Sequence, residues 1–228
     1  MPFKSLFFSL LLALSGPLAA SERLLVCLGD SLTAGLGLNE EQAYPALIQK
    51  PLAALSPPWR VVNAGVSGDT SAGGLKRLDW VLRSHPDAIF IALGANDGLR
   101  GLDPQTTEAN LRAAIQKSKA GGARVFLAGL DLPSNLGSGY RSEFKAVFPR
   151  VAKAEGVPLL GFLLEGVGGQ PSLNLADGMH PNETGHIKVA AHVLAFLEPK
   201  LKALPFKAAV NASAPKVLRH RNALEGQP

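Results

Sequence analysis

The chain has 228 residues, of which 46% are hydrophobic and 18% charged. This length and composition suit one globular domain that buries a core without disulfide staples, and a single cysteine, Cys27, excludes an intramolecular disulfide. The net charge of +5 arises at the C-terminal end: residues 1–199 hold 17 basic and 17 acidic residues, whereas residues 200–228 hold six basic residues and one acid. The neutral body shows no basic, aromatic-bearing face, which argues against nucleic-acid binding.

The first residues have the pattern of a targeting signal. Lys4 precedes an apolar stretch over 6–14, and small residues follow up to Ala20. The pattern predicts a signal peptide over residues 1–20, cleaved after Ala20, because the apolar stretch is short for a membrane span. An uncleaved anchor is the alternative. In either case we expect the folded domain, residues 21–203, to work in the periplasm or outside the cell.

Short runs typical of strands alternate with longer segments of helical period from Leu24 onward. The predicted strands cover 24–28, 60–63, 88–93, 124–128 and 157–162. The predicted helices cover 41–55, 72–84, 104–120, 138–155 and 183–202, with interruptions expected near Pro51 and Pro149. This alternation implies right-handed βαβ units, and therefore an α/β fold whose five-stranded parallel sheet carries helices on both faces.

Four polar turns stand out in this frame. They cover 29–31, 65–70, 94–97 and 177–181, each after a predicted strand. Taken alone, each is typical of an ordinary turn or helix cap. Because the carboxyl ends of parallel strands share one edge of a sheet, the four turns are expected to converge there, where ligand sites of such folds gather. Together they indicate a functional site.

The residue types in these turns fit nucleophilic hydrolysis. A serine hydroxyl such as that of Ser31 needs an imidazole to accept its proton. His180 can be that base, and Asp177, three residues earlier, can orient the imidazole and stabilise its charged form. Donors for a developing oxyanion are available from the backbone N–H groups of Ser31 and Gly68 and from the side-chain amide of Asn96.

The other histidines fit this role less well. His85 lies at a helix exit, and His220 lies in the C-terminal segment. His186 and His192 fall six residues apart in the last predicted helix, on different faces, which argues against a metal pair. No metal or cofactor is expected. Cys27 lies in an apolar run and is expected to be a buried, inert thiol.

These four turns resemble the conserved blocks of the GDSL, or SGNH, hydrolase superfamily, whose second name takes the residues that Ser31, Gly68, Asn96 and His180 match. Residues 96–101 and 132–135 are also similar to loops of its branch of bacterial periplasmic thioesterases I, lysophospholipases L1 and arylesterases. The resemblance covers residues 24–197. It departs at Ala95, where that branch often has a glycine, and a methyl group there is expected to narrow the pocket.

The resemblance implies a three-layer α/β/α flavodoxin-like fold and a metal-independent acyl-enzyme mechanism on acyl esters or thioesters. The family's nucleophile maps to Ser31, its acid and base to Asp177 and His180, and its oxyanion donors to Gly68 and Asn96. The segment 131–140 resembles that branch's mobile substrate loop; from its residues alone it is equally typical of a plain surface turn. Within the superfamily, a carbohydrate O-acetyl esterase is the alternative.

Two other functional classes, a phosphotransfer enzyme and a non-catalytic binding module, fit the residues less well. Residues 30–33 weakly resemble a phosphoaspartate motif with Asp30 as nucleophile, but Leu32 stands where the second aspartate belongs. A non-catalytic lipid- or glycan-binding module on the same fold has no need of a triad. Residues 204–228 are predicted to form a basic, disordered tail, because they are rich in alanine and have few large apolar groups. This tail is a candidate contact with anionic lipid or cell-wall polymer, and a monomer is expected.

Overall fold

The computed structural model describes residues 22–205 and contains one five-stranded parallel sheet within them. The strands lie in the order β2-β1-β3-β4-β5. Their bounds are β1 (Arg23–Gly29), β2 (Trp59–Gly65), β3 (Ala88–Ala92), β4 (Arg124–Gly129) and β5 (Leu159–Phe162). The predicted signal peptide, His220 and all but the first two residues of the predicted tail lie outside the described residues.

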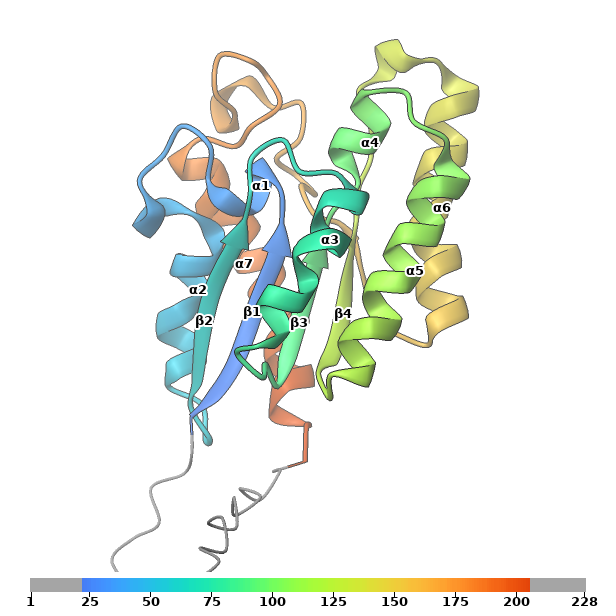
Figure 1. Cartoon of the computed structure of the whole chain (residues 1–228). Coiled ribbons are helices and arrows are strands. Elements are labelled where there is room, and N and C mark those ends of the chain that lie inside the picture. Colours follow the sequence, from blue (N-terminus) through green and yellow to red (C-terminus); the bar gives the residue numbers. More distant parts are fainter. Residues whose placement is uncertain (1–21, 206–228) are drawn as a thin grey trace, which may run out of the picture.

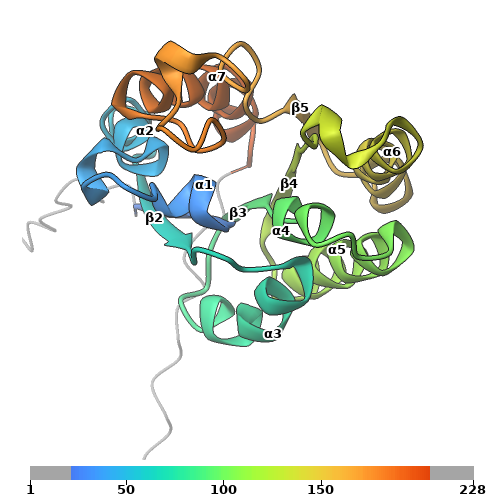
Figure 2. The same cartoon turned by 90° about the horizontal axis from the view of Figure 1, so that it is seen from above.

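Helices cover both faces of this sheet and complete three layers. They are α1 (Ser31–Ala34), α2 (Tyr44–Ala53), α3 (Ser71–Leu82), α4 (Ala95–Leu99), α5 (Pro104–Ala120), α6 (Ser138–Glu155) and α7 (Glu183–Lys202), with 3-10 turns η1 (Glu40–Gln42), η2 (Ser134–Leu136) and η3 (Pro171–Leu173). Figures 1 and 2 show α2 and α7 on one face and α3, α5 and α6 on the other. The predicted three-layer α/β/α fold is confirmed.

The central strands β1 and β3 are apolar because helices cover both faces of the sheet. Every residue of β1 and of β3 is buried, as expected for parallel strands with helices on both faces. Cys27 lies on β1 with no exposed surface, and burial raises the pKa of its thiol to about 12. The thiol is therefore protonated and inert, as predicted. Among the helices that the structure describes, none has the length and apolar character to cross a bilayer.

The interruptions expected at two prolines are wrong. Helix α6 runs unbroken through Pro149, and α2 continues past Pro51 to its end at Ala53. Pro149 is exposed, so water can satisfy the carbonyl that its missing N–H leaves unpaired. The opposite face of α6 holds the helix in place through a buried apolar stripe of Phe144, Val147, Phe148 and Val151. Helix α2 also starts later than predicted, at Tyr44, with a proline in its first turn.

The strand order places the polar turns together. After β1 and β2 the chain crosses to the other side of β1 and adds β3, so the order reverses between β1 and β3. In flavodoxin-like sheets ligands bind outside the carboxyl ends of the strands at this switch point. The short helices α1 and α4, which follow β1 and β3, both lie at this end of the molecule (Figure 1).

Candidate active site

Ser31 is the first residue of α1, and only Asp30 separates it from the end of β1. Asp30 caps this short helix, because its Oδ1 accepts the backbone N–H of Leu32 at 3.0 Å. The end of β2 packs closely on α1: a Cβ at Gly65 would lie 2.2 Å from the backbone nitrogen of Ala34. The nucleophile candidate therefore stands on a tight strand-to-helix turn, with 8% of Ser31 exposed.

His180 reaches Ser31 from the segment that precedes α7. The Oγ of Ser31 lies 2.8 Å from Nε2 of His180, and Nδ1 of His180 lies 2.7 Å from Oδ2 of Asp177. The other carboxylate oxygen of Asp177 accepts the backbone N–H groups of Met179 and His180 at 2.9 and 3.0 Å. These two N–H bonds are the main reason why the pKa of Asp177 is lowered to about 2. Asp177 is thus a fixed anion on one side of the imidazole.

The segment that carries these two residues is anchored at both ends. The backbone N–H of Leu175 donates to the carbonyl of His180 at 2.7 Å, which closes the turn. Asn182 caps α7 by accepting the N–H of Gly185 at 3.0 Å. The predicted serine, histidine and aspartate therefore form a connected chain of hydrogen bonds, although 149 residues separate Ser31 from His180. Such a chain can move a proton from the hydroxyl to the imidazole.

Gly68 lies at the tip of the turn after β2. Its φ of +80° is in the left-handed region, and this requires glycine there. Crowding does not require glycine there, because a Cβ at this position would contact only Nη2 of Arg100, at 3.7 Å. Arg100 donates from Nη2 to the Gly68 carbonyl at 2.8 Å. Within residues 22–205 the Gly68 N–H meets no acceptor.

Asn96 lies in α4, at the carboxyl end of β3. Its Nδ2 donates to the backbone carbonyl of Asp69 at 3.0 Å and lies 3.5 Å from Oδ2 of Asp30. The second distance is at the outer limit for a hydrogen bond. The structure therefore brings Asn96 beside the turn that holds Gly68 and beside Asp30, with one amide hydrogen firmly engaged.

Asp30, Asp69 and Asp97 also lie in the polar turns. None of them was assigned a role in hydrolysis from the sequence, and the structure shows what each contacts. Asp30 is fully buried, and burial raises its pKa to about 6. A carboxyl group in that position is no accessible nucleophile, which counts against the phosphoaspartate alternative. Asp97 is also buried and accepts both the N–H and the hydroxyl of Ser71, at 2.7 and 2.5 Å. It ties α4, and with it Asn96, to the start of α3. Asp69 pairs with Arg77.

The other three histidines of the described residues take no part in the chain of hydrogen bonds at Ser31. His186 is buried in α7, accepts the backbone N–H of Tyr44 at 3.1 Å, and has its pKa lowered to about 4 chiefly by burial. His192 contacts the carbonyl of Phe162, and His85 is exposed beyond α3. In the part of the chain that the structure describes, no three His, Cys, Asp or Glu side chains are grouped as a metal site would require.

The candidate loop at 131–140 is tied down at its ends. Arg141 forms two hydrogen bonds of 2.9 Å with the carboxylate of Asp131, and the Tyr140 hydroxyl donates to the carbonyl of Leu102 at 2.7 Å. The loop thus lies against the segment that follows α4. Its mobility and its role with substrate stay predictions. So does the narrowing of the pocket by Ala95, which packs against the hydrophobic core.

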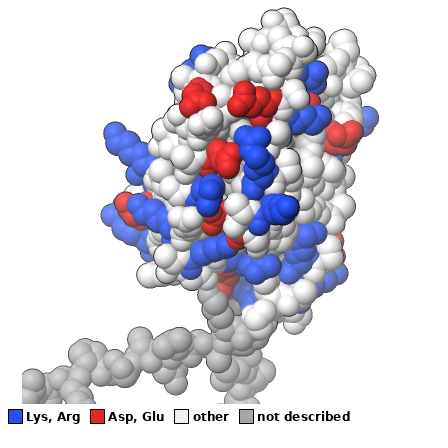
Figure 3. Space-filling model, turned by 90° about the vertical axis from the view of Figure 1, so that its right-hand side faces the viewer, with Lys and Arg blue, Asp and Glu red and all other residues white. Residues whose placement is uncertain are grey.

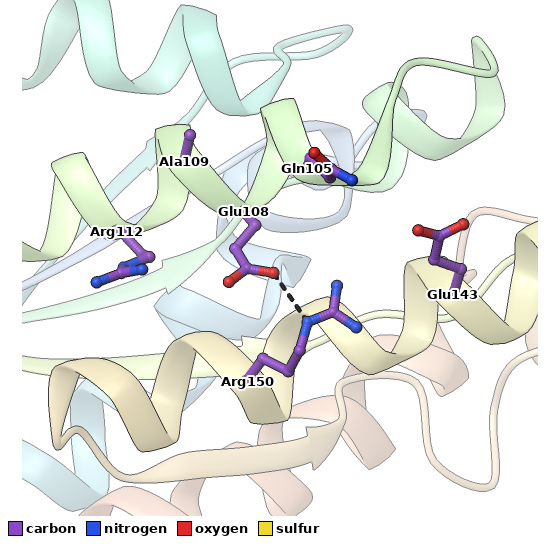
Figure 4. A pocket seen from close by; sticks show the side chains of 6 residues that line it. All are labelled: Gln105, Glu108, Ala109, Arg112, Glu143 and Arg150. Carbon is purple, nitrogen blue, oxygen red and sulfur yellow. Dashed lines mark hydrogen bonds and ion pairs between the residues drawn. The ribbon is translucent and has the colours of Figure 1, made fainter.

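A hollow of about 460 Å³ lies away from this site, on the outer side of α5 and α6. It is lined by Gln105, Glu108, Ala109, Arg112, Glu143 and Arg150 (Figure 4). Basic and acidic side chains are interspersed over this side of the molecule (Figure 3). An ion pair of 2.9 Å between Arg150 and Glu108 crosses the hollow. The hollow is therefore a charged seam between two helices rather than a pocket for an acyl group.

Comparison with known proteins agrees with the geometry. Residues 27–187 match the model of the GDSL-like lipase/acylhydrolase family. The chain belongs to this family. It is 46% identical to the esterase TesA of Pseudomonas aeruginosa over 184 residues, which are 80% of this chain and 91% of that protein. It is 41% identical over 197 residues to thioesterase 1/protease 1/lysophospholipase L1 of Escherichia coli, covering 84% of this chain and 91% of that protein.

A solved structure shares the fold closely. The psychrotrophic esterase EstA from Pseudoalteromonas sp., in a form inhibited by monoethylphosphonate, superposes with a TM-score of 0.75 at 32% identity. The match covers 78% of this chain and 98% of that one. The family predicted from the four polar turns is thereby confirmed.

Proposed function

We propose that this protein is a serine esterase that hydrolyses acyl esters or thioesters through an acyl-enzyme on Ser31. The observation that carries the proposal is the hydrogen-bonded chain from Ser31 through His180 to Asp177, with links of 2.8 and 2.7 Å. The esterase and thioesterase names of the relatives support the same reaction class. Asp177, His180 and Ser31 take the roles of acid, base and nucleophile.

In the first half of the reaction, Nε2 of His180 accepts the proton of the Ser31 hydroxyl while Oγ attacks the acyl carbon. Asp177 stabilises the imidazolium that forms, and its lowered pKa keeps it ionised throughout. The imidazolium then gives the proton to the departing alcohol or thiol, which leaves the acyl group on Oγ. In the second half, His180 accepts a proton from a water molecule that attacks the acyl carbon of the acyl-enzyme. The imidazolium then returns the proton to Oγ of Ser31 as the bond to the acyl group breaks, and the carboxylic acid is released.

The negative charge on the attacked oxygen needs donors that are already in place. We assign this role to the backbone N–H groups of Ser31 and Gly68 and to the amide of Asn96. Ser31 begins a helix, where the backbone N–H has no partner within the helix. The second amide hydrogen of Asn96, whose contact with Asp30 is long, is the one that can turn to the oxyanion.

An acyl group is favoured over an acetylated sugar by the surface around the site. Seven large apolar side chains are exposed in the described part of the chain: Leu36, Val66, Trp80, Leu99, Leu102, Met179 and Ile187. Val66 and Met179 lie on the turns that carry Gly68 and His180. Leu36 follows the helix that begins at Ser31, and Leu99 and Leu102 lie at and just beyond the end of the helix that carries Asn96. An apolar rim of this kind fits a hydrocarbon chain better than a polyol.

The test of the function is covalent labelling by a fluorophosphonate probe. The wild-type protein is expected to incorporate one probe per chain, and Ser31→Ala none. A well-folded wild-type protein that resists the probe contradicts the proposal and favours a non-catalytic binding module.

The substrate class is tested by p-nitrophenyl esters from C2 to C16, with a lysophospholipid and acetylated xylan in parallel. We expect turnover by the wild-type protein to rise with the length of the acyl chain. Replacing Leu99 and Leu102 by serine should lower turnover of the long esters. The matched control is Ile187→Ser, which replaces an exposed apolar residue of α7 outside this set of five and should leave turnover of every ester unchanged. Preference for acetylated xylan would favour the carbohydrate esterase.

The setting of the enzyme is also a proposal. The pattern of residues 1–20 supports export to the periplasm or beyond, and fractionation of cells that express the full chain, with and without these residues, tests it. A monomer is expected by light scattering. Binding of the full chain, but not of a chain ending at 205, to vesicles of anionic lipid would support a peripheral contact through the basic C-terminal residues.

A further inference from the structure

Arg77 joins the end of β1, which leads to Ser31, to the turn after β2, which carries Gly68. From α3 its Nε donates to Oδ2 of Asp69 at 2.7 Å, and its Nη2 donates to the carbonyl of Gly29 at 2.8 Å. Gly29 ends β1 two residues before Ser31, and Asp69 directly follows Gly68. One guanidinium thus links the turn after β1 to the turn after β2. Both partners of the ion pair are largely buried, with 21% and 12% of their side chains exposed.

Besides Arg77, Arg100 supports the turn after β2, because its Nη2 donates to the carbonyl of Gly68 at 2.8 Å, and two backbone hydrogen bonds add to this. At its start, the N–H of Val66 donates to the same Gly29 carbonyl at 3.0 Å, and the N–H of Asp69 donates to the carbonyl of Val66 at 3.0 Å. Between these points Gly68 is exposed and in a left-handed conformation. The side chain of Asp69, held by Arg77, is therefore the fixed end of the turn on its far side.

The same contact reaches Asn96. The backbone carbonyl of Asp69 accepts the Asn96 amide at 3.0 Å, so a shift of Asp69 moves both Gly68 and the partner of Asn96. The fold makes room for this arrangement in α3. A Cβ at Gly73 would lie 1.8 Å from Oδ1 of Asp69, so a side chain at this position would displace the carboxylate from its present place beside Arg77.

We propose that Arg77, acting through Asp69, is a positioning residue that sets the Gly68 N–H and the Asn96 amide relative to Ser31. This inference rests on the proposed esterase function. Donors aimed at an oxyanion stabilise the transition state only when they are held in place before the reaction. A misplacement of about 1 Å far from the chemistry can cost roughly 10²-fold in rate. The loss should appear in kcat, because the substrate in its ground state does not yet carry the oxyanion.

The test measures p-nitrophenyl butyrate hydrolysis by Arg77→Met, Arg77→Lys and Asp69→Asn. We expect kcat to fall by about 10- to 100-fold in Arg77→Met with KM nearly unchanged. Arg77→Lys should be impaired as well, because one ammonium lacks the fork that serves two acceptors at once. The rate of inactivation by a p-nitrophenyl phosphonate should fall in parallel. Arg150→Met, which breaks the ion pair to Glu108 in the seam of Figure 4, is the matched control and should keep the wild-type kcat.

A double-mutant cycle with Asn96→Ala separates positioning from plain stability. If Arg77 acts through the oxyanion donors, Arg77→Met should cost much less kcat in the Asn96→Ala background than in the wild type. Equal losses of kcat in both backgrounds would overturn the proposal. If Arg77→Met fails to fold, a wild-type kcat in both Arg77→Lys and Asp69→Asn would overturn it instead. An inactive wild-type protein would instead overturn the esterase function itself.

Discussion

The hydroxyl of Ser31 lies 2.8 Å from Nε2 of His180, and the two residues belong to opposite ends of the sequence. The contact exists because β1 and the segment before α7 both end at the same edge of the sheet. It is also short enough for direct proton transfer, with no water between. The imidazole is therefore placed as the base of Ser31 before any substrate binds.

His180→Ala is expected to lower kcat by about 10⁴-fold or more, because Ser31 then has no proton acceptor. Steady-state hydrolysis of p-nitrophenyl butyrate measures the loss, and circular dichroism checks the fold. His85→Asn is the matched control, because His85 is exposed at φ +49°, a conformation that asparagine tolerates. Turnover retained in His180→Ala would mean that another group is the base.

Asn96→Ala is expected to lower kcat by about 10²- to 10³-fold with little change in KM. The amide meets the oxyanion only in the transition state, so ground-state binding should not depend on it. Rates over a range of substrate concentrations separate the two constants. A change confined to KM would show that Asn96 contacts substrate and leaves the oxyanion to the two backbone N–H groups.

The sequence predicts the frame of this fold well, for reasons visible in particular elements. The apolar runs of β1 and β3 have no polar residue to conflict with burial on both faces. The predicted bounds of α5, α6 and α7 match the structure at both ends, helped by Gly121 and Gly156 after α5 and α6 and by the cap residue Asn182 before α7. The sequence does not predict the effect of Pro149, because the cost of a proline in a helix depends on whether its side of the helix faces water.

The positions of Ser31, Gly68, Asn96, Asp177 and His180 were likewise predictable, because each follows a strand and shares one sheet edge. The contacts that hold these residues in place could not be predicted from the sequence. The pairing of Arg77 with Asp69 depends on how α3 leans on the turn before it, and the burial of Asp30 depends on the packing of α1. Neither leaves a periodic or compositional signal, and the short helices α1 and α4 are below the length at which periodicity is detectable.

Gly185→Ala is expected to destabilise the protein by about 1–3 kcal/mol through overpacking. A Cβ there would lie 2.2 Å from the carbonyl oxygen of Leu173, which also accepts the N–H of Asn182. The segment with Asp177 and His180 lies between these contacts, so kcat should fall too. Urea unfolding measures the stability.

Gly139→Ala in α6 is the matched control, because a Cβ there meets no atom within 4 Å. Its stability should be unchanged or higher by up to about 1 kcal/mol, since alanine restricts the unfolded chain more than glycine does. If both variants lost stability equally, the crowding at Leu173 would not be the cause.

Asp30→Asn is expected to change stability in a pH-dependent way. Burial raises the pKa of Asp30 to about 6 in the folded protein, whereas an unfolded aspartate titrates at about 3.9. Between these values the folded state keeps a proton that the unfolded state has released. The stability of the wild type therefore falls as pH rises from about 4 to about 6, and the loss persists above that.

Asparagine is neutral at every pH and can still accept the N–H of Leu32, so Asp30→Asn should escape this loss. Relative to the wild type, the variant is expected to gain about 2 kcal/mol between pH 4 and pH 7. His186 acts with the opposite sign, because its pKa is lowered to about 4 and its stabilising effect is lost as pH falls through that window. That effect is common to both proteins and cancels in the difference. Urea unfolding of the wild type and of Asp30→Asn at pH 4, 5, 6 and 7 measures the difference in their free energies of unfolding. A difference that stays constant over this range would show that Asp30 is already ionised at pH 4.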